Sequence, residues 1–330
     1  MDETPSQLAF DHRPVMKREI VESFRDVPTG VVLDATLGSG GHSEAILDSR
    51  HDLRILGIDR DPAALAAATS RLGRFGDRVM TYRCRFDALD DAMAAHSIDE
   101  LSGALFDLGV SSPQLDRPER GFSYRHDGPV DMRMDTDAPW SADDVVNGYA
   151  EHELVRVLRD LGDERFAGRI ARAIVAARPI ESTTRLAEIV TSAIPAPARR
   201  TGGHPARRTF QAIRIEVNGE LDALPEALDR AIDALVPAGR IAVLSYHSGE
   251  DRIVKDRIRE AVTGGCECPP ELPCVCGAVQ TVRIVRMPKR PSAVEQSANR
   301  RAASARLRVA EKMDRRTGHD PDRDPARKAS

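Results

Sequence analysis

The chain contains 330 residues, of which 41% are hydrophobic and 30% are charged, and its formal net charge is −4 at pH 7. This composition is that of a globular protein with room for about two domains, and no apolar run is long enough to cross a bilayer. Asp2 and Glu3 are acidic where a secretory signal is basic and then apolar. These observations argue against a secreted or membrane protein, and we expect a soluble, cytoplasmic one.

The first predicted strand, residues 31–35, leads into a loop rich in glycine. Its apolar start fits a parallel strand that is covered on both faces. Gly38, Gly40 and Gly41 then free the backbone where a helix should begin, and backbone N–H groups at a helix start can bind a polar ligand. The loop therefore predicts a ligand site.

The second predicted strand, residues 54–59, ends in Asp59, which follows Gly40 by 19 positions. This spacing suits a carboxylate that accepts hydrogen bonds from the ribose of a bound nucleoside. A dinucleotide-binding loop needs a third glycine near position 43, but the chain has Ser43. NAD is therefore disfavoured, and the loop looks more like that of class I methyltransferases, which bind S-adenosylmethionine.

Further strands are predicted at residues 78–83 and 102–107, with a helix opened by Asp61 and Pro62 between the second and third strands. This alternation predicts an α/β fold with a Rossmann-like parallel sheet. Ligands of such sheets bind outside the carboxyl ends of the strands. One crevice should therefore be bordered by Asp34, Asp59, Phe86 and Asp107.

The middle of the chain interrupts this alternation. An irregular section extends from Asp107 to about Pro139, amphipathic helices follow to about Leu235, and strand character returns only at residues 240–244. We expect an inserted, all-helical substrate-recognition subdomain. The predicted units are a discontinuous cofactor-binding domain (1–115 and 236–312), the insertion (116–235) and a disordered tail (313–330).

Basic residues gather in two places. From Arg283 onward there are 14 Lys and Arg against 6 Asp and Glu, a balance of +8, which leaves −12 for residues 1–282. A second cluster lies in the insertion, where residues 205–221 predict a helix with one apolar face and one polar face. The alternative is a plain solvated surface, but arginines alternating with amides favour contact with RNA phosphates and base edges. The predicted contacts are Arg207, Arg208, Gln211, Arg214 and Asn218.

Four of the five cysteines lie within residues 266–276. Only one residue separates each pair, whereas zinc sites usually have two, and a disulfide is disfavoured in a reducing cytoplasm. A structural zinc site and a loop of reduced thiols both stay open. The four cysteines are Cys266, Cys268, Cys274 and Cys276.

The chain resembles the MraW-like family of small-subunit ribosomal RNA methyltransferases over residues 12–312. The most specific motifs are DATLGSGGHS at 34–43 and DLGVSSPQLD at 107–116. The resemblance also includes residues 12–16, 120–123, 127–135, 209–218, 245–248 and 307–312.

This resemblance implies transfer of a methyl group from S-adenosylmethionine to the exocyclic N4 of a cytidine in the decoding centre of 16S rRNA. Whether free rRNA or the 30S subunit is methylated stays open, as does a monomeric or dimeric state. The Asp107 carboxylate or backbone carbonyls in the loop after it would act on the amino group, and Tyr246 or Trp140 would supply a flat surface for the flipped base. His42 and Gln114 are assigned through the resemblance alone. The implied cofactor contacts are Gly40, Gly41, His42, Asp59, Phe86, Asp107 and Gln114.

Two other classes of protein compete with this interpretation. A nucleotide-dependent dehydrogenase could use the same sheet, but Ser43 argues against it. An RNA-binding assembly factor with a vestigial pocket is also conceivable, but it would not need both Asp59 and Asp107.

Overall fold

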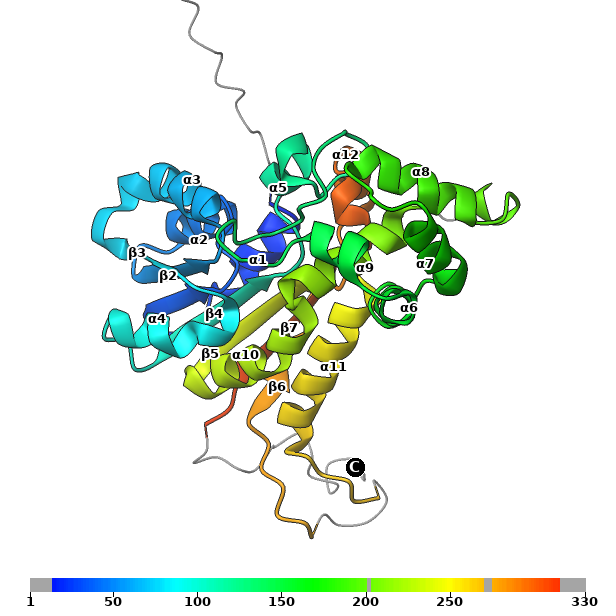
Figure 1. The fold of residues 1–330 in the computed structure, drawn as a ribbon. Coiled ribbons are helices and arrows are strands. Elements are labelled where there is room, and N and C mark those ends of the chain that lie inside the picture. The colour runs from blue at the N-terminus through cyan, green and yellow to red at the C-terminus, as the bar shows by residue number, and fades with distance from the viewer. Residues whose placement is uncertain (1–13, 201–202, 270–274, 315–330) are drawn as a thin grey trace, which may run out of the picture.

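The computed structural model describes residues 14–200, 203–269 and 275–314. Their centre is a seven-stranded sheet with the strand order β3-β2-β1-β4-β5-β7-β6 (Figure 1). All five predicted strands are present, although β5 begins five residues earlier than predicted. The strands are β1 (Gly30–Asp34), β2 (Leu53–Asp59), β3 (Val79–Arg83), β4 (Leu101–Asp107), β5 (Leu235–Ser245), β6 (Val282–Ile284) and β7 (Arg306–Lys312).

The predicted α/β fold with a Rossmann-like parallel sheet is confirmed, and the sheet also contains antiparallel pairs that were not predicted. Strands β1 to β5 are parallel, but β7 runs antiparallel to both β5 and β6. Strand β7 is difficult to recognise in the sequence, because it ends in two charged residues, Glu311 and Lys312, that are nevertheless buried. Glu311 pairs with Arg240 and Arg283, and the Lys312 ammonium donates to the carbonyl of Ile232.

Alternate side chains of the strands enter two separate cores, as the two-residue period of a strand requires. Val31 and Leu33 of β1 point to one face, and Val32 points to the other. The face with Val32 is covered by α1 (Lys17–Ser23), α2 (Gly41–Ser49) and α3 (Pro62–Leu72). The other is covered by α4 (Leu89–Ala95), α10 (Glu220–Ala234) and α11 (Ser248–Thr263).

The helix predicted after Asp61 is α3, and its start has the expected cap. Pro62 occupies the first helical position, where its missing N–H costs nothing. The Asp61 carboxylate accepts the backbone N–H of Ala63 at 3.0 Å. This cap directs the chain away from the carboxyl end of β2 and leaves Asp59 at the edge of the sheet.

The middle of the chain forms a helical unit with its own core, beside the sheet (Figure 1). Within its described part, the stretch between β4 and β5 contains no strand. The core of this unit extends from Phe122 to Ile213. The helices in this stretch before α10 are α5 (Ser112–Asp116), α6 (Glu151–Asp160), α7 (Ala167–Ala176), α8 (Thr183–Ala193) and α9 (Arg207–Asn218); α12 (Ala293–Ala298) follows β6.

Helix α10 falls within the predicted insertion 116–235 but packs differently from the helices before it. Leu224, Leu228 and Ile232 of α10 pack in the core of the sheet and not in that of the helical unit. Gly219 has a left-handed backbone (φ 57°) and separates α9 from α10, so the predicted helix 205–221 is divided there. We therefore propose a domain boundary at Gly219. The predicted tail 313–330 lies outside the described residues from 315 onward.

Candidate active site

The carboxyl ends of the parallel strands open onto a cavity of about 790 Å³. The four residues that were predicted to border one crevice all line it. The opposite wall includes Arg207 and Gln211 from α9 of the inserted unit. The cavity thus lies between the sheet and the insertion, which is a common location for ligand sites.

The glycine loop shapes the floor of this cavity. Gly40 caps α2 with a left-handed backbone (φ 78°) and does not line the cavity. A Cβ atom there would lie 3.0 Å from the Leu72 side chain, so Gly40 lets α2 approach α3 closely. Gly41 does line the cavity. The first backbone N–H groups of α2, from Gly41 onward, have no acceptor within the helix and carry its positive dipole end.

His42 is buried at the start of α2 and lines the cavity. Its Nε2 lies 3.3 Å from Oδ2 of Asp107. The angle is not that of a hydrogen bond, and neither ring nitrogen has a hydrogen-bond partner among the described residues. Both ring nitrogens are therefore without hydrogen bonds at the wall of the cavity, where a ligand could bind them.

Asp59 ends β2 with both carboxylate oxygens directed at backbone groups. Oδ2 accepts the N–H of Gly38, and Oδ1 accepts that of Asp61, each at 2.9 Å. Burial raises the pKa of Asp59 in spite of these two bonds. Each oxygen keeps a second lone pair, so the carboxylate can still accept hydrogen bonds from sugar hydroxyls.

Asp34 ends β1 and is almost completely buried beneath the loop. Burial raises its pKa from 3.8 to about 6, although hydrogen bonds from Ser43 and Thr36 oppose this rise. The Ser43 hydroxyl donates to Oδ2 of Asp34 at 2.6 Å. Ser43 therefore binds a carboxylate at the position where a dinucleotide-binding loop would need glycine.

Asp107 ends β4 and is held from two sides. The phenol of Tyr246 donates to its Oδ1 at 2.6 Å, and its backbone N–H donates to the Thr36 hydroxyl at 2.6 Å. Burial and the neighbouring Asp107 carboxylate raise the pKa of Tyr246 well above 10. The side chain of Asp107 is 26% exposed, so its other oxygen is accessible from the cavity.

Glu250, from the first turn of α11, fixes the backbone beside Tyr246. Its carboxylate accepts the N–H groups of Tyr246 and His247 at 2.7 and 3.2 Å. Burial alone would raise the pKa of Glu250, but the imidazole of His247, with Nε2 3.1 Å from Oε1, lowers it below 4.5. Nothing in the sequence distinguishes Glu250, because an acidic residue in a first helical turn is common.

Phe86 and Gln114 line the cavity in different ways. Phe86 contacts Phe106 edge to face, at 6.2 Å between ring centroids. The Gln114 amide is used inside the protein: its oxygen accepts the Ser111 N–H, and its nitrogen donates to Asp61 at 3.0 Å. Gln114 therefore ties the loop after β4 to the start of α3, which makes it a positioning residue.

Five residues of α9 were predicted to contact RNA. Two of them, Arg207 and Gln211, line the cavity and make no side-chain hydrogen bond or ion pair within the described part of the chain. Arg214 also lines it, but its guanidinium is paired with Glu220 at 2.8 and 3.0 Å. Arg208 is outside the lining and donates to the carbonyl of Asp163. Asn218 is buried and holds Met132 and Met134 through backbone hydrogen bonds.

The aromatic side chains that line the cavity are Phe86, Phe122, Phe210 and two tyrosines. Tyr246 lines it, whereas Trp140 is 44% exposed, contacts Tyr149 and is not part of the lining. Trp140 is therefore not the stacking surface of this cavity. Tyr124, which the sequence analysis did not select, lines the cavity and stacks on His204 at 4.4 Å between ring centroids.

The chain has a clear set of relatives. The model of the MraW methylase family matches residues 9–313. A ribosomal RNA small subunit methyltransferase H of Mycobacterium sp. (strain KMS) is 50% identical over 316 residues, which cover 93% of this chain and 85% of the relative. The protein of that name from Heliobacterium modesticaldum is 49% identical over 313 residues, covering 93% and 100%.

A solved rRNA methylase from Streptococcus thermophilus matches with a TM-score of 0.38 and 12% identity, covering 90% of this chain and 94% of that one. Among the described helices, none combines the length and apolar character that a bilayer span requires. The identities over nearly the whole length decide the family. The chain belongs to the MraW methylase family of S-adenosylmethionine-dependent methyltransferases.

Proposed function

We propose that this protein methylates the exocyclic N4 of a cytidine in the decoding centre of 16S rRNA, in the cytoplasm and on the 30S subunit. The observation that carries the proposal is the continuity of one cavity. It extends from the glycine loop and Asp59, past Asp107, to Arg207 and Gln211 of the insertion. A pocket suited to the cofactor and a surface suited to RNA therefore meet at the carboxylate of Asp107.

The sheet side of the cavity suits S-adenosylmethionine. Asp59 suits its ribose, and the unpartnered ring of His42 with the first N–H groups of α2 suits the carboxylate of its amino acid end. When bound, this cofactor supplies an electrophilic methyl group on a positively charged sulfur. The remaining requirement is an aligned nucleophile, which the protein must provide through positioning.

Asp107 is the residue best placed to align that nucleophile. The amino nitrogen of cytosine is weakly nucleophilic because its lone pair is delocalised into the ring. Oδ2 of Asp107, which Tyr246 does not bind, can accept one amino N–H and so orient the nitrogen. The negative carboxylate also stabilises the positive charge that develops on this nitrogen.

The insertion side of the cavity suits a nucleotide taken out of an RNA structure. Tyr246 and Tyr124 offer aromatic surfaces for a flipped base. Arg207 and Gln211 have no hydrogen bond or ion pair within the described part of the chain and can bind phosphate and base edges. The 30S subunit is the proposed substrate because its folded rRNA presents both the base and the flanking phosphates together.

The proposal is tested by incubating 30S subunits and naked 16S rRNA, both from cells lacking this protein, with S-adenosylmethionine and the purified enzyme. Mass spectrometry of the digested RNA should find N4-methylcytidine at one decoding-centre position, with 30S subunits as the better substrate. Asp107→Ala should abolish the product, whereas Asp99→Ala, an exposed residue near the opposite end of the same strand, should not. A methyl group on another atom, or full activity of Asp107→Ala, would refute the proposal.

A further inference from the structure

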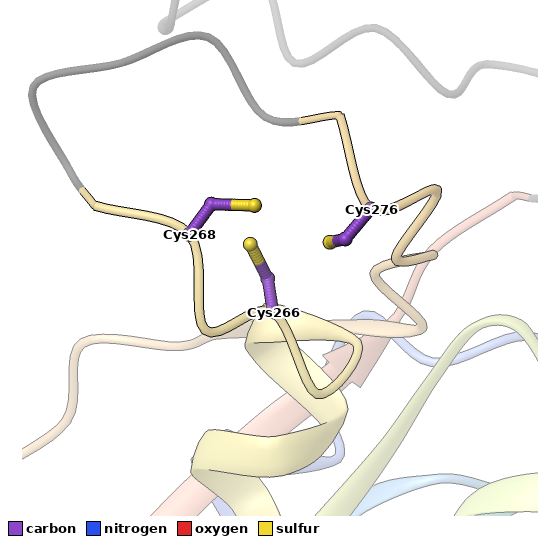
Figure 2. Close-up of side chains that lie close together, drawn as sticks. All are labelled: Cys266, Cys268 and Cys276. Atoms are coloured by element: carbon purple, nitrogen blue, oxygen red, sulfur yellow. The ribbon is translucent and has the colours of Figure 1, made fainter.

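Three cysteines gather in the loop that joins α11 to β6. Figure 2 shows the thiols of Cys266, Cys268 and Cys276 turned toward one another. Their Sγ atoms all lie within 4.8 Å of one another. We propose that these three thiols bind a zinc ion, which holds this loop in its folded form.

The spacing of the sulfurs suits a tetrahedral ion. A Zn–S distance of about 2.3 Å places the sulfurs of a tetrahedral site about 3.8 Å apart, so the three atoms need to move by only about 1 Å. Thiolates are soft ligands that favour zinc over magnesium or calcium. Three thiolates leave one tetrahedral position for another ligand, and Cys274 of the predicted set lies outside the described residues.

Backbone contacts at the end of α11 bring these cysteines together. Gly264 ends α11 with a left-handed backbone (φ 62°), and a Cβ atom there would lie 2.4 Å from the carbonyl oxygen of Val279. The returning chain therefore packs directly on the end of the helix. The Thr281 N–H donates to the carbonyl of Ala261 at 2.9 Å and closes the neck of the loop.

Apolar burial does not hold this loop. None of its described residues, 264–269 and 275–281, is buried, and Val275 is 89% exposed. Small units without a core are commonly stabilised by a metal. The α11 carboxyl end has a negative dipole, which disfavours unneutralised thiolates nearby. A bound zinc ion neutralises the thiolates and so removes their repulsion by the helix dipole. Each thiol that becomes a ligand releases its proton to water.

The zinc site is structural and separate from the proposed methyl transfer. Helix α11 has 16 residues and is therefore about 24 Å long. Its first residues adjoin Tyr246 and His247, which line the cavity, whereas the cysteine loop follows its other end (Figure 1). The ion consequently stabilises the loop without contacting the bound cofactor or the RNA base.

Metal analysis of the full chain, purified without chelators, tests this assignment. We expect one zinc ion per chain in the wild type and in Cys84→Ser, and less than about a tenth of that in Cys268→Ser and Cys276→Ser. Cys84 is a suitable control because it lies after β3, away from the loop, and burial raises its thiol pKa to about 12. Cobalt added to the apoprotein should give the thiolate-to-metal absorption of a tetrahedral site.

A second measurement does not depend on activity. Removing zinc should increase cleavage after Glu267 by a glutamate-specific protease at least about tenfold, because the loop then opens locally. The assignment would be overturned if the wild-type protein contained no zinc and its cobalt-treated form showed no thiolate-to-metal absorption. It would also be overturned if Cys268→Ser and Cys276→Ser both retained zinc. A disulfide between these cysteines in freshly purified protein would overturn it as well.

Discussion

The phenol of Tyr246 donates a 2.6 Å hydrogen bond to Oδ1 of Asp107. Strand pairing produces this contact, because the β4–β5 register places Asp107 opposite Leu244, two residues before Tyr246. Burial and the carboxylate raise the pKa of Tyr246 well above 10, so the phenol remains a donor throughout the neutral pH range. One oxygen of Asp107 is thus fixed by a hydrogen bond, whereas the other, Oδ2, lies 3.3 Å from Nε2 of His42 without a hydrogen bond to it.

Replacing Tyr246 by Phe should lower kcat for rRNA methylation about tenfold or more. A hydrogen bond to a charged group contributes about 1.5–3 kcal/mol, and its loss leaves the Asp107 carboxylate less well oriented. Single-turnover methylation of 30S subunits measures this effect, and calorimetry should find cofactor affinity nearly unchanged.

Tyr149→Phe is a matched control for that variant. Tyr149 also donates to a carboxylate, Glu216, at 2.9 Å, but it lies outside the lining of the cavity. This change should leave kcat unaltered. Equal losses in the two variants would mean that general destabilisation, and not the Asp107 contact, explains the effect.

Replacing Asp59 by Asn should weaken S-adenosylmethionine binding at least about tenfold, because the amide loses the charge and turns one NH₂ group toward a backbone N–H. The affected donors are Gly38 and Asp61, which both bind Asp59. Calorimetry with the cofactor measures the change. Asp52→Asn, directly before the opposite end of β2, should bind normally, and normal binding by Asp59→Asn would exclude the proposed ribose contact.

The strands and the sheet side of the cavity could be predicted because local signals determine them. The apolar runs marked β1 to β5, and parallel strands bring their last residues to one edge whatever lies between them in sequence. This reasoning reached Asp59 and Asp107 without any relative. By contrast, β7 could not be predicted, because Glu311 and Lys312 are buried only through partners that are distant in the chain.

The polar stripe of α9 shows a second limit. The period of 3.6 residues correctly separated Phe210 and Ile213 from the polar residues. It could not reveal that Arg214 is paired with Glu220 across the break at Gly219, or that Asn218 is buried. The Arg214–Glu220 pair and the burial of Asn218 both depend on the change of chain direction at Gly219, which helical periodicity cannot predict.

Replacing Arg214 by Ala should lower stability more than substrate use. Its side chain and that of Glu220 are only 13% and 7% exposed, so the variant leaves a carboxylate buried without its partner. Breaking such a pair costs about 3–5 kcal/mol of unfolding free energy. The double variant Arg214→Met with Glu220→Leu should recover most of the lost unfolding free energy, as measured by urea unfolding. A higher KM at unchanged stability would instead assign Arg214 to RNA binding.

Arg207 and Arg208 are neighbours with different expected roles. Arg207→Glu should raise KM for 30S subunits about tenfold, because it places a negative charge where phosphate is expected. Arg208→Glu should change KM much less, since Arg208 is outside the lining and donates to Asp163. Cofactor affinity should be unchanged in both. If the two variants weaken RNA use equally, the cavity is not the specific entry site.

Asp34 should make the folded protein less stable as pH rises. Its pKa is 3.8 in the unfolded chain and about 6 in the folded one, mainly because of burial. Between these values the folded state binds more protons than the unfolded state, so unfolding free energy falls as pH increases. The shift of about 2 units corresponds to about 3 kcal/mol of stability, which is fully present below about pH 4 and is lost between about pH 4 and pH 6.

Asp34→Asn removes this titration, so the difference between wild type and variant isolates it from all other groups. The stability of the variant relative to wild type should increase by about 3 kcal/mol from pH 4 to pH 7, measured by urea unfolding at closely spaced pH values. Asp52→Asn is the opposite case, because the Arg50 and Thr29 hydrogen bonds lower the pKa of Asp52. Its relative stability should fall as pH rises from acid toward neutral. A pH-independent difference for Asp34→Asn would show that Asp34 is not shifted and that water reaches it beneath the glycine loop.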